Sequence, residues 1–215
     1  LVGSKRFWRG SMMDDYKQHN THAYNLYSKI YDQKFKVFFM ERVKKVADIF
    51  LKEIKGKKIV DLGCGPGNHA EYFQKHGLDV LCVDSAKGML EHCKEKGLKV
   101  MHADLEDVSF PKHTFDGVWA FTSLIHIPKK NILPVVQRIV DMLKPNGLFG
   151  LSVKEGTTEG YETRESYPGT KKYVTYFTDK EIRQLFGKDF DIIFSNRNYK
   201  DDKHIFLNYV MRLKN

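Results

Sequence analysis

Short apolar runs alternate with longer stretches of helical periodicity through most of this chain. The apolar runs have the length and composition of buried strands, and the stretches between them place apolar residues on one face with a period of about 3.6 residues. The predicted strands are 57–62, 79–84, 98–103, 115–121 and 147–153, and the predicted helices are 36–55, 68–76, 86–96 and 129–143. This alternation predicts an α/β fold, with a parallel sheet and helices on both of its faces.

A further helical segment precedes this pattern. Residues 14–32 carry Tyr24, Tyr27 and Tyr31 on one helical face. Two interpretations of this aromatic face stay open: it packs on the domain, or it forms a lid over a bound ligand. We therefore divide the chain into an N-terminal tail with a lid helix and one main domain, over residues 1–34 and 35–215.

A second pattern begins after the last predicted parallel strand. Residues 155–170 are polar and contain glycines and a proline, and residues 171–177 alternate like a strand. Thr178 then opens a helix with a capping box. Residues 155–177 therefore interrupt the regular alternation and are interpreted as an insertion.

The turn after the first predicted strand carries the strongest chemical signal. That strand ends at Asp61, and Gly63, Gly65 and Gly67 follow before a helix begins at Asn68. Glycines allow positive φ angles and a close approach of the backbone to a ligand, and a helix start offers free N–H groups to an anion. The dinucleotide spacing G-x-G-x-x-G would require a glycine where Asn68 stands, which disfavours a nicotinamide cofactor.

The pattern D-x-G-x-G-x-G, from Asp61 to Gly67, resembles motif I of the class I S-adenosylmethionine (SAM)-dependent methyltransferases. The resemblance covers about residues 35–213. It implies a Rossmann-like, doubly wound sheet of seven strands, mostly parallel, closed by an antiparallel C-terminal hairpin from the apolar runs 190–195 and 205–212. It also implies SAM as cofactor, S-adenosylhomocysteine (SAH) as product, and substrate specificity built by the insertion at 155–177.

Acidic residues at the next strand ends fit the same cofactor. Asp84 ends the second strand, where an acid accepts hydrogen bonds from the ribose hydroxyls. In the resembled family an acid at the third strand end, here Asp104, accepts from the adenine amino group, and the next apolar residue, Leu105, packs on the ring. Asp61 is placed for the methionine amine of SAM.

Four more residues complete the expected cofactor site. The amides around Cys64, between the glycines, suit the carboxylate of SAM. Ser85 follows the ribose-binding acid, and Met89 lies one turn into the next helix, where it covers the adenine or packs in the core. Phe121, at the end of the fourth strand, offers a ring on which cofactor or substrate could stack.

His126 is the candidate catalytic residue. The stretch Leu124-Ile125-His126-Ile127-Pro128 resembles the L-x-H-x-P of small-molecule methyltransferases such as the ubiquinone-pathway O-methyltransferases. Those enzymes carry Glu directly before the histidine, whereas this chain has Ile125, so their metal-assisted O-methyl chemistry does not follow from the motif. An imidazole with a pKa of about 6.5 suits a general base. The alternative is a histidine that only shapes the pocket wall.

Composition limits the location and the partners. Three cysteines form neither a disulfide framework nor a zinc-binding spacing, so we assign no metal and expect a cytoplasmic protein. We also expect no membrane span and no signal peptide, because no apolar run is long enough. The net charge of +9 is compatible with nucleic acid, but no RNA-binding motif accompanies it.

These patterns predict a methyltransferase that transfers a methyl group from SAM to a small-molecule acceptor, as a monomer or homodimer. Two alternatives stay open. An RNA or protein methyltransferase is favoured only by the basic charge. A non-catalytic SAM-binding protein would share every cofactor residue and differ only in its acceptor pocket.

Overall fold

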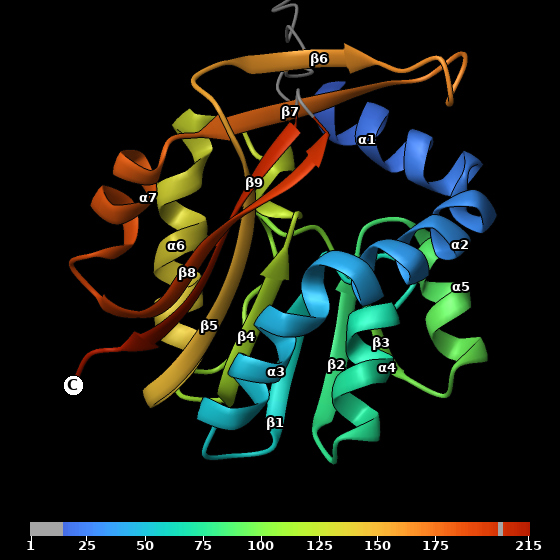
Figure 1. The fold of residues 1–215 in the computed structure, drawn as a ribbon. Helices are drawn as coiled ribbons and strands as arrows, with labels where there is room; N and C mark the ends of the chain where they lie inside the picture. Colours follow the sequence, from blue (N-terminus) through green and yellow to red (C-terminus); the bar gives the residue numbers. More distant parts are fainter. Residues whose placement is uncertain (1–14, 202–203) are drawn as a thin grey trace, which may run out of the picture.

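The computed structural model describes residues 15–201 and 204–215, so predictions for residues 1–14 lie outside the described range. Nine strands form a sheet with the order β3-β2-β1-β4-β5-β7-β6, and β9 pairs with both β5 and β8 (Figure 1). The strands are β1 (Lys58–Leu62), β2 (Asp79–Asp84), β3 (Lys99–His102), β4 (Phe115–Phe121), β5 (Leu143–Glu155), β6 (Glu159–Thr163), β7 (Lys171–Phe177), β8 (Phe190–Asp201) and β9 (His204–Leu213).

Helices connect and cover these strands. They are α1 (Asp15–Leu26), α2 (Ser28–Phe38), α3 (Lys44–Glu53), α4 (Asn68–Lys75), α5 (Lys87–Glu95), α6 (Ile132–Met142) and α7 (Asp179–Phe186), with a π-helical turn at Phe39–Val43 and 3-10 turns at Leu124–His126 and Lys129–Asn131. In the described ranges, no helix has the length and apolar character needed to cross a membrane.

Strand β1 lies at the centre of the parallel part of the sheet. It pairs in parallel with β2 on one side and with β4 on the other, and β2–β3 and β4–β5 extend the parallel pairing outward. The chain order therefore reverses between β1 and β4, and ligands of such sheets bind at the carboxyl ends of the strands beside this reversal. The predicted doubly wound, mostly parallel sheet with its antiparallel β8–β9 hairpin is confirmed.

The sheet has two strands more than the seven that the sequence implied. Both come from residues 155–177, which form the antiparallel pair β6–β7: β7 has the bounds of the strand predicted from the alternation at 171–177, and β6 was not predicted. The end of β7 pairs in parallel with the end of β5, where Lys154 faces Tyr176 and Glu155 faces Phe177. The hairpin consequently lies across the carboxyl-terminal edge of the parallel strands, at the top of Figure 1.

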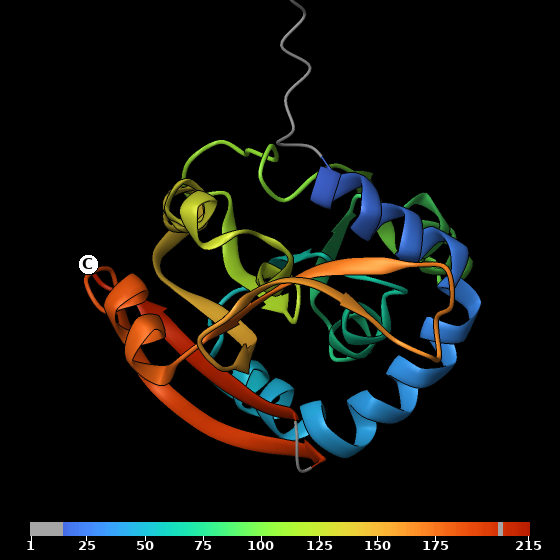
Figure 2. The same ribbon diagram turned by 90° about the horizontal axis from the view of Figure 1, so that it is seen from above.

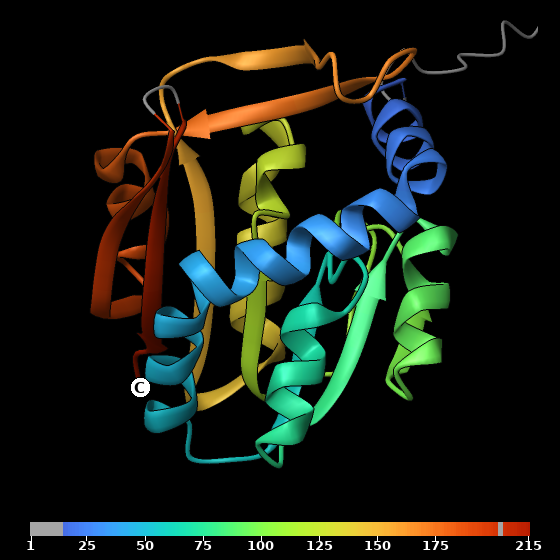
Figure 3. The same ribbon diagram turned by 45° about the vertical axis from the view of Figure 1, so that its right-hand side comes forward.

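The N-terminal helices differ from their predicted bounds. The helical segment predicted for 14–32 is divided at Tyr27 into α1 and α2, and α2 continues through the π-helical turn into α3, across the predicted boundary between 32 and 36. Next to this break, Asn25 Oδ1 accepts a 2.8 Å hydrogen bond from the backbone N–H of Gly88, which holds the end of α1 on α5. Figure 3 shows the change of direction between α1 and α2.

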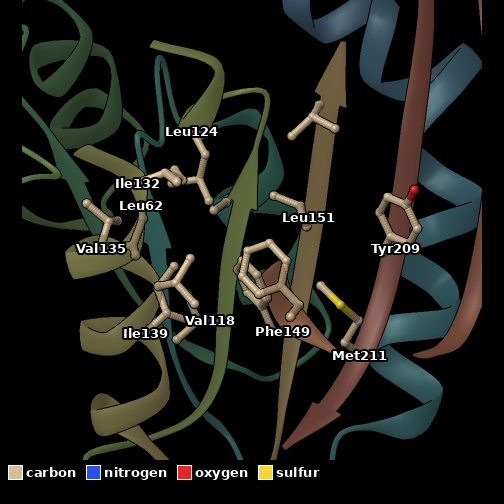
Figure 4. Close-up of a cluster of buried hydrophobic side chains, with 14 of the residues drawn as sticks. Leu62, Val118, Leu124, Ile132, Val135, Ile139, Phe149, Leu151, Tyr209 and Met211 are labelled. Atoms are coloured by element: carbon tan, nitrogen blue, oxygen red, sulfur yellow. The ribbon is translucent and has the colours of Figure 1, made fainter. Parts of the chain in front are cut away.

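Two apolar layers enclose the sheet. On one face, α3 and α4 pack on the strands through residues such as Phe50, Phe73 and Trp119. On the other face, α6 and α7 pack through residues such as Ile139 and Phe149 (Figure 4). Viewed from above, α6 and α7 lie at the left, and the blue N-terminal helices α1 and α2 run along the right (Figure 2). This packing holds the strand ends, and the loops that follow them, in fixed positions.

Candidate active site

The glycine turn after β1 requires glycine at its outer positions. Gly63, Gly65 and Gly67 have φ angles of 71°, 54° and 81°. A Cβ atom on Gly63 would lie 2.3 Å from Cβ of Ser123, and one on Gly67 would lie 2.8 Å from Sγ of Cys93. The turn is thus constrained both by backbone conformation and by close neighbours.

Two buried polar atoms beside this turn lack partners. Asp61 Oδ2 and Ser123 Oγ make no hydrogen bond with any described residue. Asp61 is 1% exposed, and burial raises the pKa of its carboxyl well above the usual range. Because buried polar groups in folded proteins are nearly always hydrogen-bonded, these atoms mark where a polar ligand group fits. Ser123 was not predicted from the sequence, although it follows the end of β4.

Asp84 has a structural role that the sequence did not predict. Its Oδ2 accepts from the Gly65 N–H at 2.9 Å, and its Oδ1 accepts from the Ala86 N–H at 2.8 Å. Burial raises the pKa of Asp84 to about 6. Each carboxylate oxygen can accept a second hydrogen bond, so the residue can hold the glycine turn and still bind a diol. The neighbouring Ser85 Oγ lies 3.1 Å from Thr21 Oγ1 on α1.

The residues predicted for the adenine end differ in their surroundings. Asp104 Oδ1 accepts from the Glu106 N–H at 2.8 Å and lies 3.2 Å from Nζ of Lys17 on α1. Leu105 is close to the glycine turn, since its Cδ1 would lie 3.5 Å from a Cβ on Gly63. Met89 is buried in a cluster with tyrosines of the N-terminal helices, so the packing interpretation describes its present contacts.

Phe121 does not present an open stacking surface. Its ring stacks on Trp119, with centroids 4.4 Å apart and planes 4° apart, and it meets His69 edge-on. Trp119 Nε1 donates to His69 Nδ1 at 3.0 Å. The two rings belong to the core layer under α3 and α4, so core packing occupies the Phe121 ring.

Side-chain contacts on two sides hold helix α1 over the carboxyl-terminal edge of the sheet. On one side, Lys17 and Thr21 reach the loops after β3 and β2. On the other side, Asn20 Oδ1 accepts from the Tyr173 N–H of β7 at 2.7 Å. The helix and the β6–β7 hairpin therefore form a joint cover over the strand ends.

A cation lies among the aromatic rings of this cover. Lys172 Nζ is 4.5 Å from the ring centroid of Tyr24 and 4.9 Å from that of Tyr31, and it donates to Tyr31 Oη at 2.7 Å. Tyr31 also stacks on Tyr167 at 4.7 Å. Burial raises the pKa of both Tyr24 and Tyr31, so both phenols are neutral and present their ring faces to the ammonium.

The ring of His126 sits between α1 and β7. Its Nδ1 is 2.8 Å from the carbonyl oxygen of Tyr173, and because a carbonyl only accepts, Nδ1 carries the proton. Nε2 accepts from the Tyr24 hydroxyl at 2.7 Å. Burial, with a smaller contribution from the positive charge of Lys172, lowers the pKa of His126 to about 3. The imidazole is therefore neutral near pH 7 and directed toward the cover.

Comparison with known proteins shows which proteins this chain resembles. The methyltransferase domain family matches residues 59–147. The ubiquinone biosynthesis O-methyltransferase of Azorhizobium caulinodans is 26% identical over 152 residues, which cover 64% of this chain and 59% of that protein. The aklanonic acid methyltransferase DauC of a Streptomyces species is 31% identical over 143 residues, which cover 61% and 63%. The chain thus spans about three fifths of the length of these curated relatives.

Solved structures extend the likeness to the whole fold. The 1,6-didemethyltoxoflavin-N1-methyltransferase of Burkholderia thailandensis, with bound 1,6-didemethyltoxoflavin and SAH, has a TM-score of 0.68 at 20% identity and covers 100% of this chain and 94% of its own. The range 59–147 includes the glycine turn, the three predicted strand-end acids and the histidine motif. The resemblance predicted from the sequence is confirmed at this level: residues 59–147 match the methyltransferase domain family, and the chain has the fold of SAM-dependent methyltransferase structures.

Proposed function

We propose that this protein is a SAM-dependent methyltransferase that acts on a small-molecule acceptor. The observation that carries the proposal is the pair of unsatisfied buried atoms, Asp61 Oδ2 and Ser123 Oγ, beside the glycine turn. An ammonium group supplies hydrogen-bond donors to both oxygens, and SAM carries one on its methionine part. The names of the curated relatives, which refer to ubiquinone biosynthesis and aklanonic acid, support an acceptor of the small-molecule type.

The remaining predicted residues fit the other parts of SAM. The amides of the glycine turn and the start of α4 suit its carboxylate, as in other anion sites at helix starts. Asp84 is already ordered by two backbone N–H groups, so it can accept from the ribose hydroxyls without further loss of side-chain freedom. Asp104 and Leu105 border the adenine end, with Met89 covering it.

In the proposed reaction, SAM supplies an activated methyl group on a sulfonium. The protein's contribution is to align the acceptor with that group and to exclude water, and alignment alone can be worth about 7–11 kcal/mol. Helix α1 and the β6–β7 hairpin would provide the exclusion, because together they cover the strand ends. Lys172, among the tyrosines of that cover, favours an acceptor that carries negative charge or a polarised oxygen.

His126 is proposed to act in the acceptor pocket as a positioning residue. A base with a pKa of about 3 accepts a proton poorly near pH 7, where catalytic bases work best with a pKa close to the working pH. Instead, because Nδ1 carries the proton, Nε2 is free to accept the hydrogen bond that holds the Tyr24 hydroxyl in place. Displacement of Tyr24 by an acceptor would leave Nε2 available to accept a hydrogen bond from the acceptor itself.

Calorimetry with SAM, SAH and NAD tests the cofactor part of the proposal. Binding of SAM and SAH, lost on Asp61→Asn and weakened by Ser123→Ala, is the expected result, and binding of NAD in place of SAM would overturn it. Transfer of labelled methyl groups to panels of small phenols, amines and carboxylic acids, compared with RNA and peptides, tests the acceptor class. Tight SAH binding with no transfer to any panel would favour a non-catalytic SAM-binding protein.

A further inference from the structure

Three cysteines from separate parts of the chain meet directly under the glycine turn. Cys64 belongs to the turn itself, Cys82 to β2 and Cys93 to α5. Their sulfur atoms all lie within 4.8 Å of one another, and Sγ of Cys64 and Cys93 are 3.8 Å apart. All three side chains are buried and free of disulfides. The spacing in the sequence gave no sign of this cluster.

We propose that Cys64, Cys82 and Cys93 form a three-thiolate site for a soft, thiophilic cation of the Cu(I) class. Metal–sulfur bonds of about 2.3 Å place two sulfur ligands of one ion about 3.8–4.0 Å apart. The Cys64–Cys93 separation already has this value, and the upper bound of 4.8 Å for the other pairs requires only side-chain adjustment. The site is therefore close to the geometry needed by one ion.

The ligand set decides which cation fits. Thiolates select soft ions such as Cu(I) and Zn(II). Structural zinc is almost always held by four ligands in a tetrahedron, and in the described ranges no fourth His, Cys, Asp or Glu completes the cluster. Three sulfurs alone suit Cu(I), which is stable with two or three thiolates. Apolar packing around the cluster, for example by Phe73 and Leu90, would shield the bound ion from water and oxidants.

The cluster is linked to the glycine turn by hydrogen bonds that a metal would remove. Cys64 Sγ and Cys93 Sγ both donate to the carbonyl oxygen of Gly65, at 3.4 and 3.3 Å. Metal binding replaces the thiol protons, so this carbonyl loses two donors and faces negatively charged sulfur. Gly65 also donates its N–H to Asp84, so a shift of this residue on metal binding would reach the proposed ribose-binding acid. Cation and SAM should then weaken each other's binding by the same factor, a consequence that rests on the proposed function.

Competition with a chromogenic Cu(I) chelator, under anaerobic and reducing conditions, tests the site on the full chain. We expect one Cu(I) per chain. Cys82→Ala and Cys93→Ala should each weaken binding more than about 100-fold, since even changes outside the ligand shell commonly cost about 10–100-fold. His76→Gln, an exposed histidine at the end of α4, is the matched control and should leave the affinity unchanged.

X-ray absorption of the copper-loaded natural chain makes the test independent of whether the variants fold. Three sulfur neighbours around the ion are expected. Nitrogen or oxygen neighbours, or alanine variants that fold and bind Cu(I) as tightly as the natural chain, would overturn the proposal. Failure of SAH to bind would overturn the proposed function and leave the sulfur site standing, because the copper measurements contain no SAH.

Discussion

The Tyr24 hydroxyl donates a 2.7 Å hydrogen bond to Nε2 of His126 and thereby joins helix α1 to the 3-10 turn that follows β4. The same imidazole donates from Nδ1 to the backbone of β7 at Tyr173. One neutral ring thus connects three segments that are far apart in the sequence and that border the proposed acceptor pocket. The hydrogen bond between His126 and Tyr24 should therefore be present when α1 covers the strand ends and absent when α1 moves away.

Replacing Tyr24 by phenylalanine should loosen that connection without removing the aromatic ring. Tyr24→Phe leaves Nε2 of His126 without its donor, so we expect the free energy of unfolding to fall by about 1–2 kcal/mol. Urea denaturation measures this. Tyr27→Phe is the matched control, because the Tyr27 hydroxyl bonds an exposed carbonyl at Pro168 and its loss should cost less. Equal effects of the two substitutions would contradict the proposed link.

Binding of SAH should protect helix α1 and the start of α2 from hydrogen exchange. The reason is that Lys17 and Thr21 contact loops that carry the proposed adenine- and ribose-binding acids. Mass spectrometry with and without SAH should show new protection over residues 16–31, while α7, which packs on β5 and β8 through Phe186, serves as the internal reference. Unchanged exchange over 16–31 would favour plain packing of the aromatic face.

Asp84→Asn should weaken SAH binding by about 1.5–3 kcal/mol, the scale of hydrogen bonds to a charged acceptor. Because the ionised carboxylate is the stronger acceptor and burial raises the pKa of Asp84 to about 6, SAH affinity of the natural chain should rise as the pH passes from 5 to 7. Calorimetry at several pH values measures both effects. Asp79→Asn, at the exposed start of the same strand, is the control and should bind SAH normally.

His69 should make the protein less stable in acid. Burial lowers the pKa of His69 to about 3, against about 6.5 in an unfolded chain. Below pH 6.5 the unfolded state therefore binds a proton that the folded state does not, and the stability that is complete above this pH is lost as the pH falls toward 3. Between pH 7 and 5, the stability advantage of the natural chain over His69→Gln should shrink by about 1–2 kcal/mol. If the free energies of unfolding of the natural chain and of His69→Gln changed equally with pH, this account would be contradicted.

Once an acceptor is known, His126→Asn separates positioning from base catalysis. A general base typically contributes about 10²–10⁴-fold to the rate. Since the neutral ring has a pKa of about 3 and holds Tyr24, we expect a smaller loss of turnover, unchanged SAH affinity, and no inflection of the rate near pH 6.5 in the natural chain. A large loss with such an inflection would restore His126 as the base.

The part of the site that could be predicted is local in sequence. The glycine turn, Asp61 and Asp84 are recognisable because each requirement, a positive φ or an acid at a strand end, is met within a few residues. Phe121 was expected to offer its ring for stacking, but the strand period places it in the core. It stands two positions from Trp119 in one strand, so both rings share a face and enter the same core layer.

The rest depends on contacts between distant segments, which no periodicity encodes. Ser123 becomes notable only when the end of β4 lies against Gly63. The alternation of residues 171–177 predicted β7, but the polar stretch before it gave no signal for β6, and the pairing of β7 with β5, at Lys154 and Glu155 only, joins segments that periodicity does not connect. The bounds of α1 and α2 also differ from the prediction, next to a hydrogen bond from the distant Gly88 that holds the end of α1 on α5.

Helix α1 touches both halves of the covered edge: Lys17 and Thr21 on the side of Asp104 and Ser85, Asn20 and Tyr24 on the side of Tyr173 and His126. A single undocking event, with the chain pivoting near Tyr27, would then expose both compartments together. Donor and acceptor would then enter and leave by one route, and the rate of product release by that route would set an upper limit on the turnover of the proposed methyltransferase, however fast the methyl group is transferred.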